Sequence, residues 1–316
     1  MSQVVVNTKR EFRLFTIAGT GCQIDAMVFG GDLGAKPALF ILNSHEFAMP
    51  PSERFCQQAW QAGYQVVFVR RAGYARSTPL PGALLTTSAV ESWAAVTAEA
   101  AMLCRFLDAH ANPGAVVLSI GGSNPVAYRL CHFCKTVSSF VFLNPPFNQE
   151  VWESFSPEWF RGVLQQIVAS KSGVRISSLG IKHLLRSAPI SFYRQVLSQS
   201  PGDIHYVNEN KQDFIDAGVL AQTAPPEQLF YELFINLRPD PLLKDTIFKG
   251  KNVLVVSGQE ATESWRSSLE SECRRLALPL TYLPSGFIFA PFQSPEIMFQ
   301  TLNNHLQSPQ DAVSQH

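Results

Sequence analysis

The chain of 316 residues has no charge imbalance and no long apolar run. Lysine and arginine together equal aspartate and glutamate, 25 against 25. A chain with no net charge and no long basic run is a poor match for the polyanionic backbone of nucleic acid, so we do not expect nucleic acid as a partner. No segment reaches the roughly 18 uninterrupted apolar residues that a membrane-spanning helix requires, so we expect no membrane span.

Cysteine is also sparse, with six in the chain. A count this low in a chain this long is typical of a reduced, cytoplasmic protein and not of a disulfide scaffold. The opening residues, MSQVVVNTKREFRLF, lack an apolar core flanked by a cleavage site, so we expect no signal peptide. Cys131 and Cys134 form a CxxC pair inside a predicted helix, where residues three apart share a face. No second ligand pair is evident, so we expect structural thiols, with no metal and no cofactor.

Hydrophobic residues make up 46% of the chain and charged residues only 16%, which predicts a large packed core. Residues 11–16 and 22–29 alternate apolar and polar side chains around a glycine-containing turn, which predicts a β-hairpin. Strand and helix patterns then alternate over residues 38–143, which predicts an α/β fold with a doubly wound, mainly parallel sheet. The apolar runs that predict its strands are at 38–42, 65–69, 115–119 and 140–143.

The alternation stops near residue 145 and resumes with an apolar run at 252–256. We therefore predict an α/β core of residues 10–145 and 249–307, a mostly helical insertion of residues 146–248, and a flexible tail of residues 308–316. The aromatic side chains of residues 152–160 are candidates for a pocket beneath the insertion, although aromatics at helical spacing are more often core.

One stretch of the predicted core, residues 114–130 (GAVVLSIGGSNPVAYRL), combines a strand, a sharp turn and a helix. Gly121 and Gly122 form the bend, and Pro125 opens the helix that follows. This layout is that of a nucleophile elbow, in which the turn lifts one side chain above the edge of a sheet.

The elbow and four further segments, in the same order, resemble the α/β-hydrolase superfamily. The resemblance covers about residues 10–306 and implies a sheet of the α/β-hydrolase type, with residues 146–248 as its cap. The further segments match the family's oxyanion loop and its Asp-x-Arg-Gly-x-Gly-x-Ser motif, the strand that leads to its catalytic acid, and its histidine loop. In this chain the four segments are, in the same order, ILNS (41–44), RRAGYARS (70–77), VLVVSG (253–258) and LPSGFIFAPFQSPE (283–296).

The family's catalytic groups are missing at the matching positions. Gly121 stands where the nucleophile belongs, and Ile288, or Phe287 in a loop shorter by one residue, stands where the histidine belongs. The acid position falls on Ala261, and the alternative acid position on Asn144. Acyl transfer in this family needs a nucleophile, a base and a carboxylate that orients the base, so we expect negligible hydrolysis of the usual kind.

Other polar residues near the elbow could line or rebuild a pocket. Ser123 could be the nucleophile of a shifted elbow, but the expected role is a helix cap whose oxygen accepts a backbone N–H. His45 could shuttle a proton or simply pack beside its loop, and Arg70 could hold an anion or pair with a neighbouring acid. The full set of predicted pocket residues is Asn43, Ser44, His45, Arg70, Gly121, Gly122, Ser123 and Ile288.

Three hypotheses about function follow. The first is a pseudoenzyme, a triad-less scaffold that binds a small apolar or acyl-type molecule or a partner protein. The second is a non-classical enzyme, such as a lyase or isomerase, that uses Ser123, His45 or Arg70. The third is an esterase or thioesterase with an unrecognised nucleophile. Fold alone does not choose among them.

Overall fold

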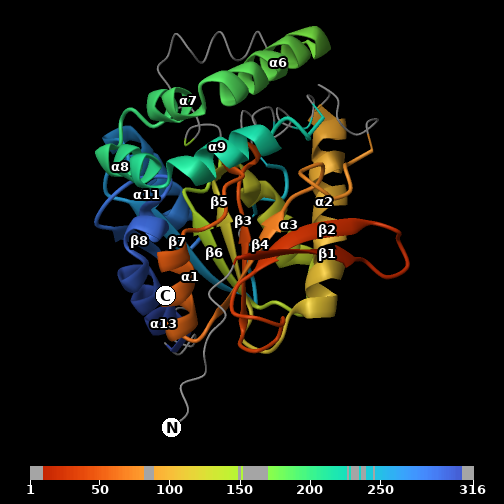
Figure 1. The fold of residues 1–316 in the computed structure, drawn as a ribbon. Coiled ribbons are helices and arrows are strands. Elements are labelled where there is room, and N and C mark those ends of the chain that lie inside the picture. The colour runs from red at the N-terminus through yellow and green to blue at the C-terminus, as the bar shows by residue number, and fades with distance from the viewer. Residues whose placement is uncertain are drawn as a thin grey trace.

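The computed structural model describes residues 10–81, 89–148, 151, 170–225, 228, 235, 240–244 and 246–307. The predicted aromatic pocket at 152–160 and the predicted tail at 308–316 lie outside these residues. In the described part of the chain the strands form one eight-stranded sheet with the order β1-β2-β4-β3-β5-β6-β7-β8 (Figure 1). The strands are β1 (Glu11–Thr16), β2 (Gln23–Val28), β3 (Ala38–Leu42), β4 (Gln65–Arg70), β5 (Val116–Ile120), β6 (Ser139–Leu143), β7 (Asn252–Gly258) and β8 (Leu280–Leu283).

The predicted hairpin and the predicted parallel sheet are both confirmed. Strand β1 pairs antiparallel with β2, and β2 pairs antiparallel with β4. All the remaining pairs, from β4 to β8, are parallel. Every residue of β3 and β5 is buried, as expected for central strands covered on both faces.

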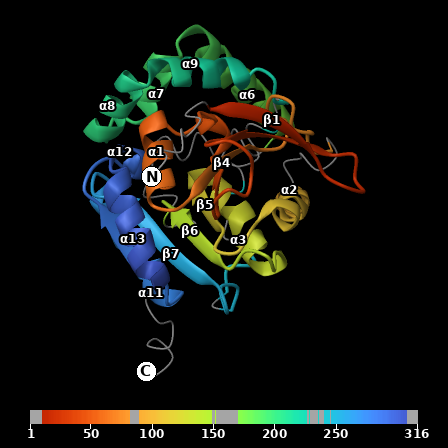
Figure 2. The same ribbon diagram turned by 60° about the horizontal axis from the view of Figure 1, so that its bottom comes forward.

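Helices cover both faces of this sheet. Helix α1 (Glu53–Gln61) packs against α13 (Pro295–Gln307), and α2 (Ala89–His110) packs against α3 (Asn124–Phe133). Figure 2 shows the two pairs on opposite sides of the strands, which is the predicted doubly wound arrangement. Helix α11 (Glu263–Arg275) connects β7 to β8, and the short α12 (Ala290–Gln293) precedes α13. No helix among these described residues is long and apolar enough to cross a membrane.

Four further helices lie together along one side of the molecule (Figure 1). They are α6 (Lys171–Ser187), α7 (Pro189–Val196), α8 (Pro201–Glu209) and α9 (Lys211–Leu220). Helices α6 and α8 begin with serine caps, since Ser170 accepts the N–H of Gly173 and Ser200 accepts the N–H of Asp203. All four lie within the predicted insertion, whose boundaries stay a prediction.

The order of the strands fixes where a site can form. The chain leaves β3 to form β4 on one side of it, and later forms β5 on its other side. Parallel strands end at the same edge of a sheet, and Leu42 of β3 is in register with Ser119 of β5. The loops that follow these two strands therefore meet at the point where the strand order reverses, which is where open α/β sheets bind ligands.

Candidate functional site

Gly121 is the tip of the turn between β5 and α3. Its φ of +54° lies in the left-handed region that favours glycine. A single 3₁₀ turn, η3 (Gly121–Ser123), includes Gly122 and leads directly into α3. Among the described residues, a Cβ atom on Gly121 would meet only the Ser44 hydroxyl, at an ordinary contact distance of 3.6 Å. The turn therefore has the shape of an elbow and space for a side chain at its tip, but carries none.

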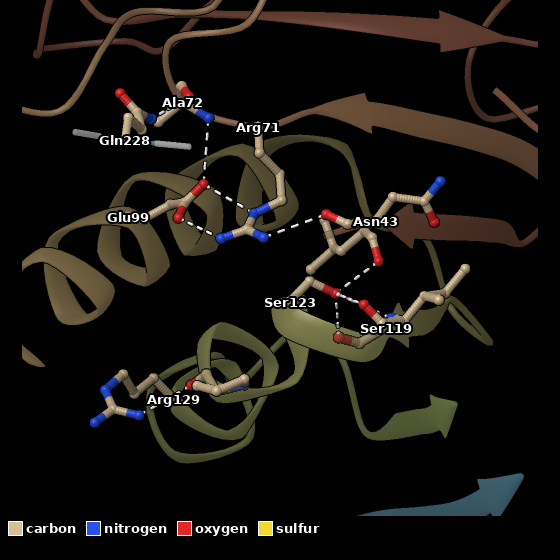
Figure 3. Close-up of polar contacts among 11 residues, drawn as sticks. Asn43, Arg71, Ala72, Glu99, Ser119, Ser123, Arg129 and Gln228 are labelled. Carbon is tan, nitrogen blue, oxygen red and sulfur yellow. Dashed lines mark hydrogen bonds and ion pairs between the residues drawn. The ribbon is translucent and has the colours of Figure 1, made fainter. Parts of the chain in front are cut away.

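The hydroxyl of Ser123 is fully buried and points back toward the sheet (Figure 3). It accepts the N–H of Ile120 at 2.9 Å and lies 2.7 Å from both the Leu42 carbonyl and the Ser119 hydroxyl. The Ile120 carbonyl is 3.0 Å away as a further acceptor. The hydroxyl therefore ties the elbow to β3 and β5, and its single proton already has protein acceptors.

The prediction that the Ser123 hydroxyl caps the following helix is wrong. Ser123 does stand at the N-cap position of α3, but its side chain makes no bond to the first turn of that helix. The 3₁₀ turn has already given Ser123 a helical backbone, with φ −79° and ψ −13°. A cap residue needs an extended backbone to aim its oxygen at the helix, so here the oxygen serves the N–H of Ile120, one turn earlier.

Asn43, Ser44 and His45 follow β3 directly and are all buried. The Asn43 amide donates to the carbonyls of Phe47 and Met49, at 2.8 and 3.0 Å, and so shapes the loop. The Ser44 hydroxyl has no hydrogen-bond partner in the described part of the chain. All three residues line a cavity of only about 10 Å³, which has room for about one water molecule.

The imidazole of His45 is stacked on the ring of Tyr74. The two rings are nearly parallel with centroids 5.1 Å apart, and the Tyr74 hydroxyl donates to the His45 carbonyl at 2.6 Å. Burial, assisted by the charge of Arg71, lowers the pKa of His45 well below its usual value of 6.5. The ring is therefore neutral at pH 7 and a weak base, as expected for the packing role that was one of its two alternatives.

Arg70, at the end of β4, is paired with an acid on the neighbouring strand. Its Nη1 lies 2.9 Å from Oδ2 of Asp25, its register partner on β2, and Arg76 binds the other oxygen at 2.8 Å. The Arg70 guanidinium also lies over the Phe12 ring, 3.5 Å from its centroid. Of the two alternatives for Arg70, the ion pair is present.

The next residue, Arg71, forms a buried ion pair with Glu99 of α2 (Figure 3). Two bonds of 2.6 and 3.0 Å join the side chains, and Arg71 also donates to the Asn43 carbonyl at 3.2 Å. Glu99 accepts the Ala72 N–H at 3.2 Å as well. This network fixes the ends of β3 and β4 against α2.

The loop that contains Phe287 and Ile288 is held by a carboxylate from α8. Asp203 accepts the backbone N–H groups of Phe287, Ile288 and Phe289 at 3.1, 2.7 and 3.1 Å, and the Gln293 amide at 2.8 Å. Burial raises the pKa of Asp203 to about 6, against the lowering effect of the three backbone N–H groups. The predicted histidine position is therefore an anchor for α8, with the Phe287 and Ile288 side chains buried.

Glu260 anchors the same helix from the loop after β7. It stands one place before the buried Ala261 and accepts the Ser200 hydroxyl at 2.7 Å and the Gly202 N–H at 2.8 Å. A Cβ on Gly202 would lie 2.8 Å from the Gly286 nitrogen, so only glycine allows this approach. The two loops at which the family's base and acid are expected thus both bind the start of α8.

Neither Asp203 nor Glu260 was predicted from the sequence as a site residue. The one available signal was the pattern Ser200-Pro-Gly-Asp203, which is typical of the start of a helix. It does not say which distant loop the carboxylate reaches.

A larger groove of about 310 Å³ lies between the core and α9. Arg10, Phe12 and Arg70 line its core side, and Asp213 and Leu220 line its α9 side. Arg10 and Asp213 form an ion pair of 2.9 Å across it. Of the predicted pocket residues, only Arg70 contributes to the described lining of this groove.

Comparisons with solved structures define the class of this fold. A protein of Pseudomonas aeruginosa described as a probable hydrolytic enzyme superposes with a TM-score of 0.61 at 15% identity, covering 95% of each chain. An α/β hydrolase enzyme from a deep-sea metagenome gives 0.60 at 12% identity, over 94% of this chain and 98% of its own. E-2-(acetamidomethylene)succinate hydrolase gives 0.58 at 15% identity, over 95% and 100%.

The chain therefore has the α/β-hydrolase fold. No protein-family model matches its sequence, and the comparison with curated proteins finds no match. At these sequence identities the likeness concerns the fold and not an activity.

Proposed function

We propose that this protein is a non-hydrolytic α/β-hydrolase-fold protein that binds a small molecule in the groove between its core and α9. In this proposal Gly121 occupies the nucleophile position, Ile288 or Phe287 the histidine position, and Ala261 the acid position. The observation that carries it is the elbow itself, which has the left-handed tip but no side chain there.

The surroundings of the elbow support a loss of catalysis. Ser123 directs its hydroxyl into the sheet, and His45 is a buried, neutral ring with a lowered pKa. Arg70 is paired with Asp25, a carboxylate that it shares with Arg76. Each of the three groups that a rebuilt active site would use is therefore buried or already paired, which disfavours both enzymatic hypotheses. A serine without a base near neutral pH stays protonated and unreactive.

The groove supports a small-molecule ligand. Its volume of about 310 Å³ is at the lower end of the range of about 300–1,000 Å³ typical of ligand pockets. The lining has an apolar part, Phe12, Ala48, Val219 and Leu220, and a charged part, Arg10, Arg70, Asp213 and Asp216. This lining fits a compact, largely apolar molecule whose acyl or carboxylate end meets the arginines.

The test has two measurements. A serine-reactive fluorophosphonate probe should leave the wild-type protein unlabelled under conditions that label an ordinary serine hydrolase. Octanoate, as a probe of the groove, should raise the melting temperature by a few degrees at saturation. Val219→Trp should abolish this shift by filling the groove, because Val219 lines it and is exposed.

Ile215→Trp is the matched control. Ile215 is also an exposed apolar residue of α9, but it is outside the described lining of the groove. Labelling that disappears in Ser123→Ala would overturn the loss of catalysis. An equal octanoate shift in wild type and Val219→Trp would overturn the ligand site. The alternative of a protein partner stays a prediction.

A further inference from the structure

Two cysteines and an aspartate converge at the end of the α2–α3 helix pair that is remote from the elbow. Cys104 and Asp108 are one turn apart on α2, and Cys134 directly follows α3. Since α3 begins at the elbow and is ten residues long, Cys134 lies about 15 Å from it along the helix axis. The proposed function uses none of these residues.

The three side chains present their ligand atoms to one another. One sulfur or oxygen atom from each residue lies within 4.8 Å of the others. The Asp108 carboxylate reaches both sulfurs, since Oδ2 is 3.6 Å from Sγ of Cys104 and Oδ1 is 3.6 Å from Sγ of Cys134. These cysteines are 30 residues apart in the chain, so the tertiary structure alone pairs them.

These separations match the edges of a tetrahedral zinc site. With Zn–S bonds of about 2.3 Å and Zn–O bonds of about 2.0 Å, tetrahedral angles place sulfur and oxygen ligands about 3.5 Å apart. The observed sulfur–oxygen separations are 3.6 Å, and each involves a different oxygen of the carboxylate. Binding one cation therefore requires the exposed carboxylate to turn one oxygen toward both sulfurs or to coordinate through both oxygens.

The surroundings are those of a ligand set. The Thr136 hydroxyl donates to Asp108 Oδ1 at 2.6 Å, which orients the carboxylate as partners of metal ligands do. Lys251 donates to the carbonyls of Cys134 and Val137, at 2.6 and 2.7 Å, and so holds the backbone at the end of α3. Cys134 is buried, Cys104 is half-buried and Asp108 is exposed, so an ion can enter from the aspartate side.

We propose that Cys104, Asp108 and Cys134 bind a thiophilic divalent cation of the Zn²⁺ type, with a water as fourth ligand, and that this ion joins the ends of α2 and α3. Cys131, the other cysteine of the CxxC pair, is not part of this set.

The experiment titrates the reduced, EDTA-treated full chain with Co²⁺ and then with Zn²⁺. We expect one Co²⁺ per chain, with the visible bands of tetrahedral cobalt and a near-ultraviolet sulfur-to-cobalt charge-transfer band, both abolished by one equivalent of Zn²⁺. Zn²⁺ should also raise the melting temperature of the wild type.

Variants assign the ligands. Cys104→Ser and Asp108→Asn should each weaken Zn²⁺ binding by more than the roughly 10- to 100-fold loss seen when an outer partner of a ligand is removed. Cys131→Ser is the control and should bind like the wild type. Asp108 is exposed, so Asp108→Asn remains informative even if a cysteine variant misfolds.

Three results would overturn the site. They are a cobalt spectrum without the charge-transfer band, an equal loss of affinity in Cys131→Ser, and a Cys104–Cys134 disulfide that forms in air while the reduced protein fails to bind Zn²⁺.

Discussion

Replacing Asp203 by asparagine tests how α8 is fastened to the loop at residues 285–289. The carboxylate is buried and accepts four hydrogen bonds, three of them from consecutive backbone N–H groups. Burial and these donors act on its pKa in opposite directions, and burial prevails, with a pKa of about 6. The substituted amide keeps the shape of the side chain but cannot ionise.

The sign of the pH dependence follows from this pKa. An acid whose pKa rises on folding holds its proton more tightly in the folded state, so its contribution to the free energy of unfolding is greatest at low pH. That contribution falls as the pH rises from about 4 to about 6 and is constant above this range. The difference between 3.8 and about 6, at about 1.4 kcal/mol per pH unit, corresponds to about 3 kcal/mol.

Urea unfolding of wild type and Asp203→Asn at a series of pH values between 4 and 7.5 measures this difference. The stability of the wild type relative to the variant should fall by about 3 kcal/mol across the series. Glu209→Gln is the control, because it makes the same change at an exposed position of α8 and should give a much smaller slope. A relative stability that rises with pH would refute the reasoning, since it would mean that the N–H donors outweigh burial.

Further substitutions test other parts of the site by urea unfolding. Arg71→Met should lower the free energy of unfolding by about 3–5 kcal/mol, because it leaves Glu99 as a buried, uncompensated charge. The double variant Arg71→Met/Glu99→Leu should recover much of this stability. Gly121→Ala should lower the free energy of unfolding by only about 1–2 kcal/mol, since its φ is positive but a Cβ fits. Gly286→Ala should cost clearly more, because its Cβ would lie 2.8 Å from the buried Asp203 Oδ1 and would displace the Gln293 amide that is hydrogen-bonded to it. Ser123→Ala should lower the free energy of unfolding by about 1–3 kcal/mol, because it removes the acceptor of a buried N–H. Equal stability of the variant and the wild type would contradict the conclusion that this hydroxyl ties the elbow to β3 and β5.

The strands and helices of the core were predictable because their signals are local. The hairpin follows from alternating side chains around glycines, and β3 follows from a run of five apolar residues. Strand β5 spans Val116–Ile120, one residue later than predicted, because pairing with β6 and not hydrophobicity sets its end. The assignment of Gly121 to the nucleophile position stays a prediction from motif register, and its positive φ is consistent with a tight turn at that point.

The chemistry of individual side chains was less predictable. Ser123 has the sequence context of a helix cap, yet the 3₁₀ turn before α3 rotates its hydroxyl toward β3. The sequence left two alternatives open for Arg70, an anion site or an ion pair, because its partner Asp25 is 45 residues away on another strand. Neither outcome is encoded within a few residues of the side chain concerned.

The sequence by itself determined the order of strands and helices along the chain, the α/β class and the absence of a side chain at Gly121. Each of these depends on residue type and near-neighbour spacing. Only the tertiary structure decided that Asp203 would bind the loop at 287–289 and that Cys104 would meet Cys134. The physical reason is the separation along the chain over which each kind of interaction acts. Periodicity and turn preferences act over a few residues, whereas these contacts join segments 84 and 30 residues apart in the chain and form only when the packed sheet and helices bring them together.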